Sequence, residues 1–548
     1  MPFVITQRCC TDASCVSECP VDCIRPRPDD PDYGTTEMLY IAPETCIDCG
    51  ACVDACPVDA IFSEFDLTAS MSRYPDINRA YFERHPLDTS VLPPRQPPRR
   101  LPKELGALRV AIVGSGPAAC YAADELLQHN DVQVEMFDRL PTPWGLVRSG
   151  VAPDHPETKG VADMFASAFR NDRFQLHLNV EVGAHISLAE LREHHHAVVY
   201  AVGASGDRRL GIPGEELPGS HSATEFVAWY NGHPDHAHHE FDLSGERAVV
   251  VGNGNVALDV ARILTLDPDE LAKTDIADHA LEALRSSNIR EVVVLGRRGP
   301  LQAAYSTPEF LALSYLPAID VVIDEAELAL DATGQAALDD PDVEPSLKLA
   351  MDLAREYAAK PAVNGNKRIV FRYLFSPNEL RGGDHVESVE LVHNILDRDL
   401  NAMATERTES IDATLVLRSV GYRGEPVVDL PFDDSRGVIP NARGRVEGMA
   451  GVYTTGWIKR GPRGVIGTNR ADSKETVSML LEDFRAGTLT APASDRAALT
   501  ALLARRRPER IDKAGWRTID TAEKAAGQAA GRPRIKRTNT GELPTAAV

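Results

Sequence analysis

Residues 108–139 read LRVAIVGSGPAACYAADELLQHNDVQVEMFDR, and this stretch decides the class of fold. Its β-branched start at 109–113 predicts a buried parallel strand, and the turn that follows contains Gly114, Ser115 and Gly116. Gly114 permits a tight turn, and Gly116 lets the backbone approach a pyrophosphate at the N-terminus of the next helix. The order of strand, glycine-rich turn and helix therefore predicts a site for a dinucleotide.

A second strand and an acidic residue strengthen this prediction. The run at 132–137 reads as a strand, and Asp138 follows it about twenty residues after the turn, the interval at which a carboxylate meets a ribose hydroxyl. The plain alternative is a glycine-rich turn in an ordinary α/β domain, which leaves the position of Asp138 as a coincidence. We therefore favour dinucleotide binding.

A second copy of the pattern lies in the middle of the chain. The strand at 248–251 leads into another turn and helix start, formed by Gly252, Asn253, Gly254 and Asn255. Each copy supports the other, because a protein that binds two dinucleotides needs two such turns.

The strand after this second turn ends in arginines and not in an acid. It spans 291–296 and is followed by Arg297 and Arg298. A carboxylate there would repel a 2′-phosphate, whereas paired guanidinium groups bind one bidentately. We therefore predict NADP as the second dinucleotide, with the acidic segment 267–287 as a helical insertion.

Composition limits the other possibilities. The 548-residue chain has a formal charge of −23 and is 43% hydrophobic, so it is long enough for several domains. The negative charge disfavours nucleic acid as a partner. We find no apolar run of about eighteen residues and no secretory signal, so we expect no membrane span and a cytoplasmic location.

Nine of the ten cysteines lie within the first 56 residues. The later ones form the run Cys46-x-x-Cys49-x-x-Cys52-x-x-x-Cys56-Pro57, which matches the iron–sulfur run of bacterial ferredoxins. Three thiolates on one tight loop reach three corners of one cluster, and the fourth reaches the other cluster. A zinc site is the main competitor, but it would not need the proline.

The earlier cysteines are spaced more loosely, as Cys9, Cys15 and Cys19 before a proline. By pseudo-symmetry, Cys19 should bind the cluster of the later run, which then has four thiolates and is predicted to be [4Fe-4S]. Cys56 should in turn bind the cluster of the earlier run. Three clear thiolates suit a [3Fe-4S] cluster there. Cys10 offers two alternatives, since it may replace Cys9 or supply a fourth ligand to a second [4Fe-4S] cluster.

This earlier half resembles seven-iron ferredoxins, which show a similar expanded spacing followed by a match to Val21–Cys23. The resemblance implies an α+β ferredoxin-like iron–sulfur domain over residues 1–66, with Cys23 as a buried spare beside the cluster. Residues 67–107 contain the proline-rich run 92–102 and are expected to form a stiff linker.

The glycine- and proline-rich loop at 143–156, with the turn before it, resembles the adrenodoxin reductase-type NADPH–ferredoxin reductases. The resemblance implies an α/β flavoprotein with two Rossmann-like dinucleotide-binding domains, one for FAD and one for NADP. The expected parts are residues 108–245 (FAD domain, first part), 246–366 (NADP domain), 367–486 (FAD domain, second part) and 487–548 (a peripheral C-terminal extension).

The same resemblance implies which side chains contact the cofactors. For FAD they are Ala118, Asp138, Leu146, Val182, Trp457, Gly464, Val465 and Ile466. For NADP they are Arg208, Glu309 and Gly464, the last shared with FAD.

A nicotinamide nucleotide, a flavin and iron–sulfur clusters together indicate electron transfer. NADPH delivers two electrons as a hydride, clusters accept one electron at a time, and a flavin handles both. The first hypothesis is a ferredoxin–NADP(+) reductase fused to its ferredoxin, with NADPH and an external ferredoxin or other one-electron acceptor as partners. The alternatives are a reductase whose clusters feed a separate oxidase or P450, and a non-enzymatic sensor. Asp154 and His155 are candidates for handling flavin protons.

Overall fold

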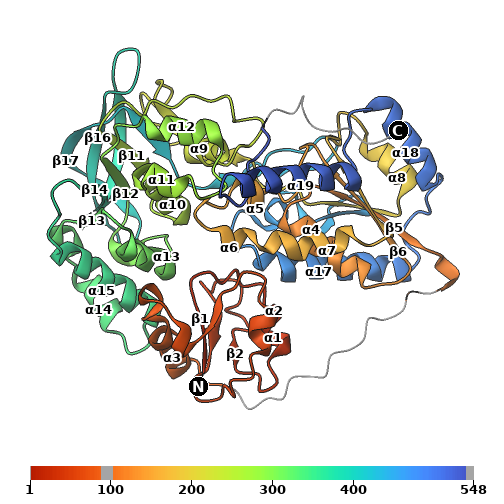
Figure 1. Cartoon of the computed structure of the whole chain (residues 1–548), viewed down its shortest axis with the longest axis horizontal. Helices are drawn as coiled ribbons and strands as arrows, with labels where there is room; N and C mark the ends of the chain where they lie inside the picture. Colours follow the sequence, from red (N-terminus) through yellow and green to blue (C-terminus); the bar gives the residue numbers. More distant parts are fainter. Residues whose placement is uncertain (1, 88–100, 102, 539–548) are drawn as a thin grey trace.

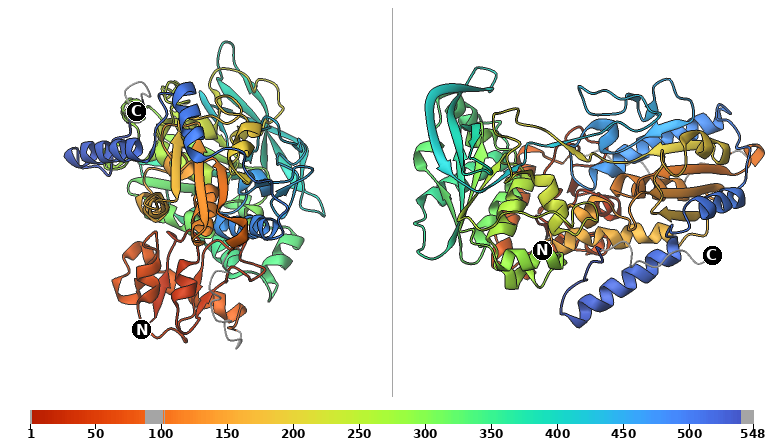
Figure 2. Two further views of the ribbon diagram at one scale, coloured as in Figure 1. Left: turned by 90° about the vertical axis from the view of Figure 1, so that its right-hand side faces the viewer. Right: turned by 90° about the horizontal axis from the view of Figure 1, so that it is seen from above.

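The computed structural model of the chain describes residues 2–87, 101 and 103–538. They form two large domains, each built on a mainly parallel sheet, and a small N-terminal domain that lies against both (Figure 1). Figure 2 shows the same arrangement from the side and from above. Within the described residues, no helix is both long and apolar enough to cross a membrane.

The first sheet contains the stretch that decides the class of fold. Its strand order is β20-β21-β22-β8-β5-β6-β7, and β22 to β7 run parallel. Strand β5 (Leu108–Val113) is almost entirely buried, and it leads into α4 (Pro117–Leu127) and β6 (Val132–Asp138). Helix α17 (Thr468–Arg485) packs along α4. The expected strand, turn, helix and second strand are confirmed. The other strands are β7 (Phe174–Leu178), β8 (Ala197–Tyr200), β20 (Asn441–Ala442), β21 (Arg445–Val446) and β22 (Val452–Thr454).

The second sheet repeats this architecture with six parallel strands in the order β10-β18-β11-β12-β14-β13. Strand β11 (Arg247–Val251) is followed by α10 (Asn255–Thr265) and later by β12 (Glu291–Gly296). The expected helical insertion between them is confirmed as α11 (Pro268–Leu271) and α12 (Asp278–Arg285). The other strands are β10 (Ser220–Ser222), β13 (Ile319–Ile323), β14 (Lys367–Tyr373) and β18 (Leu415–Arg418).

The expected return to the FAD domain at residue 367 is wrong. Strand β14 pairs with β12 and β13, and β18 pairs with β11. The chain therefore contributes strands to the second sheet until Arg418. An antiparallel sheet of β15 (Phe375–Arg381), β16 (Ser388–Leu396) and β17 (Ala402–Asp412) lies between these two strands in the sequence. Buried parallel strands have similar compositions, so the sequence does not reveal which sheet each one joins.

The N-terminal domain extends beyond the expected boundary at residue 66. Helix α3 (Tyr74–Arg84) packs on this domain. The Oδ1 atom of Asn78 accepts hydrogen bonds from the backbone N–H groups of Ile5 and Ile41, and its Nδ2 atom donates one to the carbonyl oxygen of Ile5. Residues 74–84 therefore belong to this domain and not to a linker, and the proline-rich run lies outside the described residues except for Leu101. The other elements are β1 (Phe3–Ile5), β2 (Ile24–Arg25), β3 (Tyr40–Ile41), β4 (Ile61–Ser63), α1 (Ser14–Glu18) and α2 (Ala51–Ala55).

The C-terminal extension is not peripheral, contrary to expectation. Helix α18 (Arg496–Arg506) and helix α19 (Lys513–Ala529) pack on the first domain. Glu523 of α19 is fully buried and pairs with Arg148 at 2.6 Å. The sequence does not reveal this packing, because Arg148, the partner of Glu523, lies 375 positions earlier in the chain. Residues 539–548 lie outside the described residues.

Several shorter helices and strands complete the two large domains. They are α5 (Leu146–Ser149), α6 (Pro156–Lys159), α7 (Val161–Phe169), α8 (Leu188–His194), α9 (Ala223–Tyr230), α13 (Thr307–Ala312), α14 (Ala332–Asp339), α15 (Pro345–Ala359), α16 (Trp457–Arg460), β9 (Gly206–Asp207) and β19 (Tyr422–Arg423).

Candidate functional site

The first glycine-rich turn has no room for a side chain at Gly114. Gly114 has a φ of +106°, and a Cβ atom there would lie 2.4 Å from the carbonyl oxygen of Ala201. In the next loop, a Cβ on Gly145 would lie 2.9 Å from the Cα of Gly116. This bare backbone, at the start of α4, fits the pyrophosphate of a dinucleotide.

Asp138 lies beside this turn, at the end of β6. The Ser115 hydroxyl donates a hydrogen bond to Asp138 Oδ2 at 2.5 Å, and the backbone N–H of Leu140 donates to Oδ1 at 2.8 Å. Burial raises the pKa of Asp138. Ala118 is the second residue of α4, and a Cβ on Gly456 would lie 2.6 Å from its Cβ, so the segment that begins at Trp457 lies next to the turn.

The other residues expected at FAD come from separate segments. Leu146 and Val465 are apolar side chains that remain 36% and 37% exposed, and Val465 lies between Gly464 and Ile466. Exposed apolar side chains of this kind are what a flat ring system covers when it binds. Val182 packs against an apolar cluster that contains residues of β5 and β8, whereas Ile466 packs against another apolar cluster.

The second turn has the same geometry as the first. Gly252 has a φ of +114°, and a Cβ there would lie 2.2 Å from the carbonyl oxygen of Ser419. Gly254 caps α10, and Asn255 Oδ1 accepts a hydrogen bond from the backbone N–H of Ser306 at 2.8 Å. Asn253 Oδ1 accepts from Ala304 at 3.4 Å. The turn therefore fits a second dinucleotide.

The three arginines predicted to contact NADP each follow a strand directly. Arg297 is exposed and Arg298 half-buried, directly after β12, and Arg208 is exposed after β9. In the described part of the chain, neither Arg297 nor Arg298 forms an ion pair with a carboxylate. Their guanidinium groups are thus available to a phosphate.

A buried arginine connects the two large domains. Arg262 of α10 is 3% exposed, and it donates to both carboxylate oxygens of Asp154 at 2.5 and 3.1 Å. It also donates to His155 Nε2 at 2.9 Å and to Asp259 at 2.8 Å. Burial alone raises the pKa of Asp154, but the Arg262 guanidinium outweighs it and lowers the pKa to about 2. Asp154 is therefore ionised at neutral pH.

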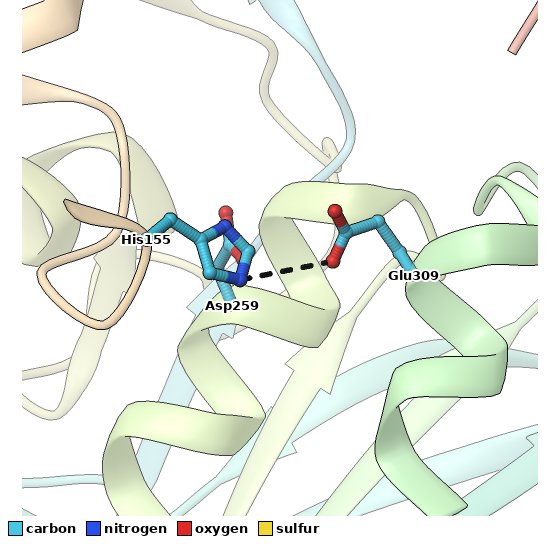
Figure 3. A group of neighbouring side chains, drawn as sticks. All are labelled: His155, Asp259 and Glu309. Atoms are coloured by element: carbon cyan, nitrogen blue, oxygen red, sulfur yellow. Dashed lines mark ion pairs between the residues drawn. The ribbon is translucent and has the colours of Figure 1, made fainter. Parts of the chain in front are cut away.

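Figure 3 shows that His155 and Glu309 face each other across this junction, with His155 Nε2 and Glu309 Oε2 4.0 Å apart. Glu309 Oε2 and Arg262 Nη1 are buried without a hydrogen-bond partner among the described residues, and they lie 3.8 Å apart. Two such atoms fit a polar group of a bound ligand. Ligand atoms of His155, Asp259 and Glu309 lie within 4.8 Å of one another, but Arg262 already supplies a positive charge there.

Sequence reasoning missed Arg262 and Asp259. The only signal was a charged pair at an i, i+3 spacing in an otherwise apolar helix. Nothing in the sequence shows that the partner of Arg262 comes from the loop at 143–156, about a hundred residues earlier.

The cysteines surround two separate cavities. We call the first the outer site; its cysteines are Cys19, Cys46, Cys49 and Cys52, with Cys23 beside them. We call the second the inner site; its cysteines are Cys9, Cys15 and Cys56, with Cys10 beside them. The two groups are those that pseudo-symmetry predicts.

Both cavities fit iron–sulfur clusters chemically. Burial raises the pKa of Cys9 to about 12 and that of Cys52 to about 12. Thiols of this kind are protonated unless a bound cation compensates the thiolate charge, as iron does. Cys9 Sγ accepts from the backbone N–H groups of Thr11 and Leu39 at 3.4 and 3.5 Å, the type of bond that tunes cluster potentials.

Sequence reasoning used the pseudo-symmetry of the two cysteine runs but missed Asp12, which the repeat places at the inner site. Shifting Cys9, Cys15 and Cys19 by 37 positions gives Cys46, Cys52 and Cys56, and the same shift carries α1 onto α2. The residue that falls on Cys49 is Asp12, which lines the inner site and is 4% exposed. The signal in the sequence is the spacing of 37 residues, which aligns this aspartate with a cysteine.

Comparison with known proteins agrees with this geometry. A family model described as pyridine nucleotide-disulphide oxidoreductase matches residues 108–296, and one described as 4Fe-4S binding domain matches residues 39–62. A probable ferredoxin/ferredoxin–NADP reductase of Mycobacterium tuberculosis is 49% identical over 100% of this chain and 95% of its own length. A mitochondrial NADPH:adrenodoxin oxidoreductase of Arabidopsis thaliana is 40% identical over 80% and 95%.

The solved structures give the same result. Mycobacterium tuberculosis FprA in complex with NADPH is 48% identical, with a TM-score of 0.77, over 80% of this chain and 98% of that one. The fold and the two kinds of site thus define an FAD- and NADP-dependent flavoprotein of the pyridine nucleotide-disulphide oxidoreductase type, with an N-terminal iron–sulfur domain. The chain belongs to the ferredoxin/ferredoxin–NADP reductases.

Proposed function

We propose that this protein is an NADPH–ferredoxin oxidoreductase that passes electrons from NADPH to its own clusters or to an external ferredoxin. One observation carries the proposal: Arg262 joins the FAD-domain loop at Asp154 and His155 to Asp259 of the NADP domain. Reductases need the two nucleotides to meet, and this junction holds the two domains together where they would meet.

The two glycine-rich turns and the residues beside them would hold the two nucleotides. The turn of Gly114, Ser115 and Gly116, together with Asp138, holds FAD, and the turn of Gly252 to Asn255 holds NADP. Arg297, Arg298 and Arg208 bind the 2′-phosphate and so favour NADPH over NADH. FAD, when bound, accepts a hydride and gives up electrons singly.

His155 is better suited than Asp154 to move a proton. Asp154 stays ionised and is engaged on both oxygens by Arg262, so we assign it to positioning that guanidinium. Arg262 donates to His155 Nε2, which leaves the Nδ1 atom of His155 to carry the proton. Glu309, with an unpartnered carboxylate oxygen, is a candidate to bind the nicotinamide amide.

We propose that the outer site holds a [4Fe-4S] cluster on Cys19, Cys46, Cys49 and Cys52, and that the inner site holds a [3Fe-4S] cluster on Cys9, Cys15 and Cys56. Asp12 stands where the repeat has Cys49, so the inner site has one thiolate fewer. The repeat also favours Cys9 over Cys10, because Cys9 is in register with Cys46. Clusters and free thiols require a reducing compartment, so a cytoplasmic location is part of the proposal.

Anaerobic purification followed by mixing with NADPH tests the proposed function. We expect a protein with bound FAD and about seven iron atoms per chain, whose flavin absorbance bleaches with NADPH far faster than with NADH. Reduction of an added ferredoxin should follow. A colourless protein, or a flavin that NADPH does not bleach, would overturn the proposal. Slow reduction of ferredoxin with fast reduction of a P450 would favour the alternative acceptor.

A further inference from the structure

The two cysteine cavities differ in what lies around them. The inner site adjoins the FAD domain, because the carbonyl oxygen of Cys10 accepts a hydrogen bond from the N–H of Gly467, whereas the outer site contains Cys49, which is exposed. Ile47, on the rim of the outer site, is 58% exposed. This asymmetry leads to an inference about the order in which the clusters act.

The contact at the inner site is built from backbone as well as side chains. The N–H of Gly467 donates to the carbonyl oxygen of Cys10 at 2.8 Å. A Cβ on Gly467 would lie 2.2 Å from the backbone N of Asp12, so only glycine allows these two segments of the chain to approach this closely. Arg470 Nη1 donates to the carbonyl oxygen of Asp12 at 2.8 Å and to Ser14 Oγ at 2.9 Å.

The same segment connects this contact to the flavin side. Gly467 directly follows Gly464, Val465 and Ile466, the three residues expected at FAD. Ile466, Cys9 and Cys56 pack against one apolar cluster, which also contains residues of α4 behind the first turn. Cys19, Cys46 and Cys52 of the outer site pack with a second apolar cluster, which also contains Cys15 and contacts Cys9 and Cys56, so the inner site lies between the two clusters.

We propose that electrons enter the N-terminal domain at the inner site, across the contact between residues 464–470 and the Cys10–Asp12 loop, and leave it from the outer site. The proposal rests on the proposed function. In balance, one NADPH becomes NADP⁺ and a proton, and its two electrons reduce the two clusters by one electron each. Electron tunnelling falls steeply with distance, so a built contact at the inner site determines which cluster is first.

Rapid freeze-quench EPR of the full-length holoprotein, mixed anaerobically with NADPH, tests this order. Arg470→Ala removes the hydrogen bonds to Asp12 and Ser14, and Gly467→Ala forces the two backbones apart. We expect both variants to slow the loss of the oxidised inner-site signal at least about 10-fold. The cluster spectra after chemical reduction, the iron content and the rate of flavin bleaching should stay unchanged.

Lys474→Ala is the matched control, since it removes an exposed charge one turn further along α17. In this variant, NADPH should reduce the inner-site cluster at the wild-type rate. The rate of this reduction should not depend on the protein concentration. The proposal fails if Arg470→Ala behaves like Lys474→Ala, even where Gly467→Ala does not fold. It also fails if Cys49→Ser, which should empty the outer site, prevents NADPH from reducing the inner one. Flavin bleaching in the same traces reports separately on the proposed function.

Discussion

The two glycine-rich turns have the same backbone geometry and opposite charge at the end of the second strand. Gly114 and Gly252 both have a φ above +100°, and each lies against the carbonyl oxygen of a neighbouring loop. The first unit ends in Asp138, which accepts a hydrogen bond from Ser115, and the second ends in Arg297 and Arg298, which pair with no carboxylate in the described parts of the chain. The backbone thus provides the general dinucleotide site, and the residue after the strand selects the nucleotide.

The largest effects should come from the shared geometry. Gly114→Ala and Gly252→Ala place a Cβ 2.4 and 2.2 Å from a carbonyl oxygen, so the turn must shift. We expect Gly114→Ala to be purified with little FAD, and Gly252→Ala to keep FAD but to raise the KM for NADPH about 100-fold or more, which is about 2.7 kcal/mol. Flavin content and steady-state kinetics measure both.

Gly365→Ala is the control for backbone strain alone. Gly365 also has a positive φ, of +97°, but no atom lies near its missing Cβ. It should cost about 1–2 kcal/mol of stability and leave both nucleotides bound. If Gly365→Ala loses cofactor as Gly114→Ala does, close approach is not what the turns require.

The next largest effect should come from the charge difference. Arg297→Ala with Arg298→Ala removes the proposed partners of the 2′-phosphate, so we expect the KM for NADPH to rise about 30–100-fold while that for NADH changes less than about 3-fold. Arg290→Ala, just before β12, removes a charge at the opposite end of the same strand and should change neither. Equal losses for NADPH and NADH would contradict the assignment.

A smaller effect should come from the junction between the two units. The folded-state pKa of Asp154, about 2, is below its ordinary value of 3.8, so the ion pair with Arg262 stabilises the fold above about pH 4 and is lost as the pH falls toward 2. We expect Asp154→Asn to cost about 2 kcal/mol at pH 7. Urea unfolding followed by flavin fluorescence measures this cost.

The difference between Asp154→Asn and the wild type should shrink only below about pH 4. Asp163→Asn is the control, because the Asp163 side chain is 85% exposed and should have almost no effect at any pH. A difference for Asp154→Asn that disappears already near pH 6 would mean that another group titrates there.

The smallest effect should come from Asp138. Asp138→Ala removes the acceptor of the Ser115 hydroxyl and the proposed partner of the ribose, so we expect FAD affinity to fall about 10-fold. Asp138→Asn keeps an acceptor and should lose less. Fluorescence titration of the FAD-depleted protein measures both, and an unchanged affinity in Asp138→Ala would show that the acid has no role in binding.

Sequence reasoning was strongest where chemistry demands a local spacing. Both turns, the strands beside them and the two cysteine groups follow from short patterns, because a pyrophosphate or a cluster must be reached by residues close together in the chain. Arg262 could not be found in this way, since its partners Asp154 and Glu309 come from different domains. The predicted boundary at residue 367 and the predicted peripheral position of the C-terminal helices were wrong for the same reason.

The sequence alone determined the two dinucleotide turns, the preference of the second for NADP, and the iron–sulfur character of the N-terminal segment. Only the tertiary structure decided that Arg262 ties the two large domains together and that the inner site contacts Gly467 and Arg470. The physical reason is that local patterns encode backbone shape and ligand spacing, whereas contacts between domains depend on pairs of residues hundreds of positions apart, which the chain brings together only when it folds.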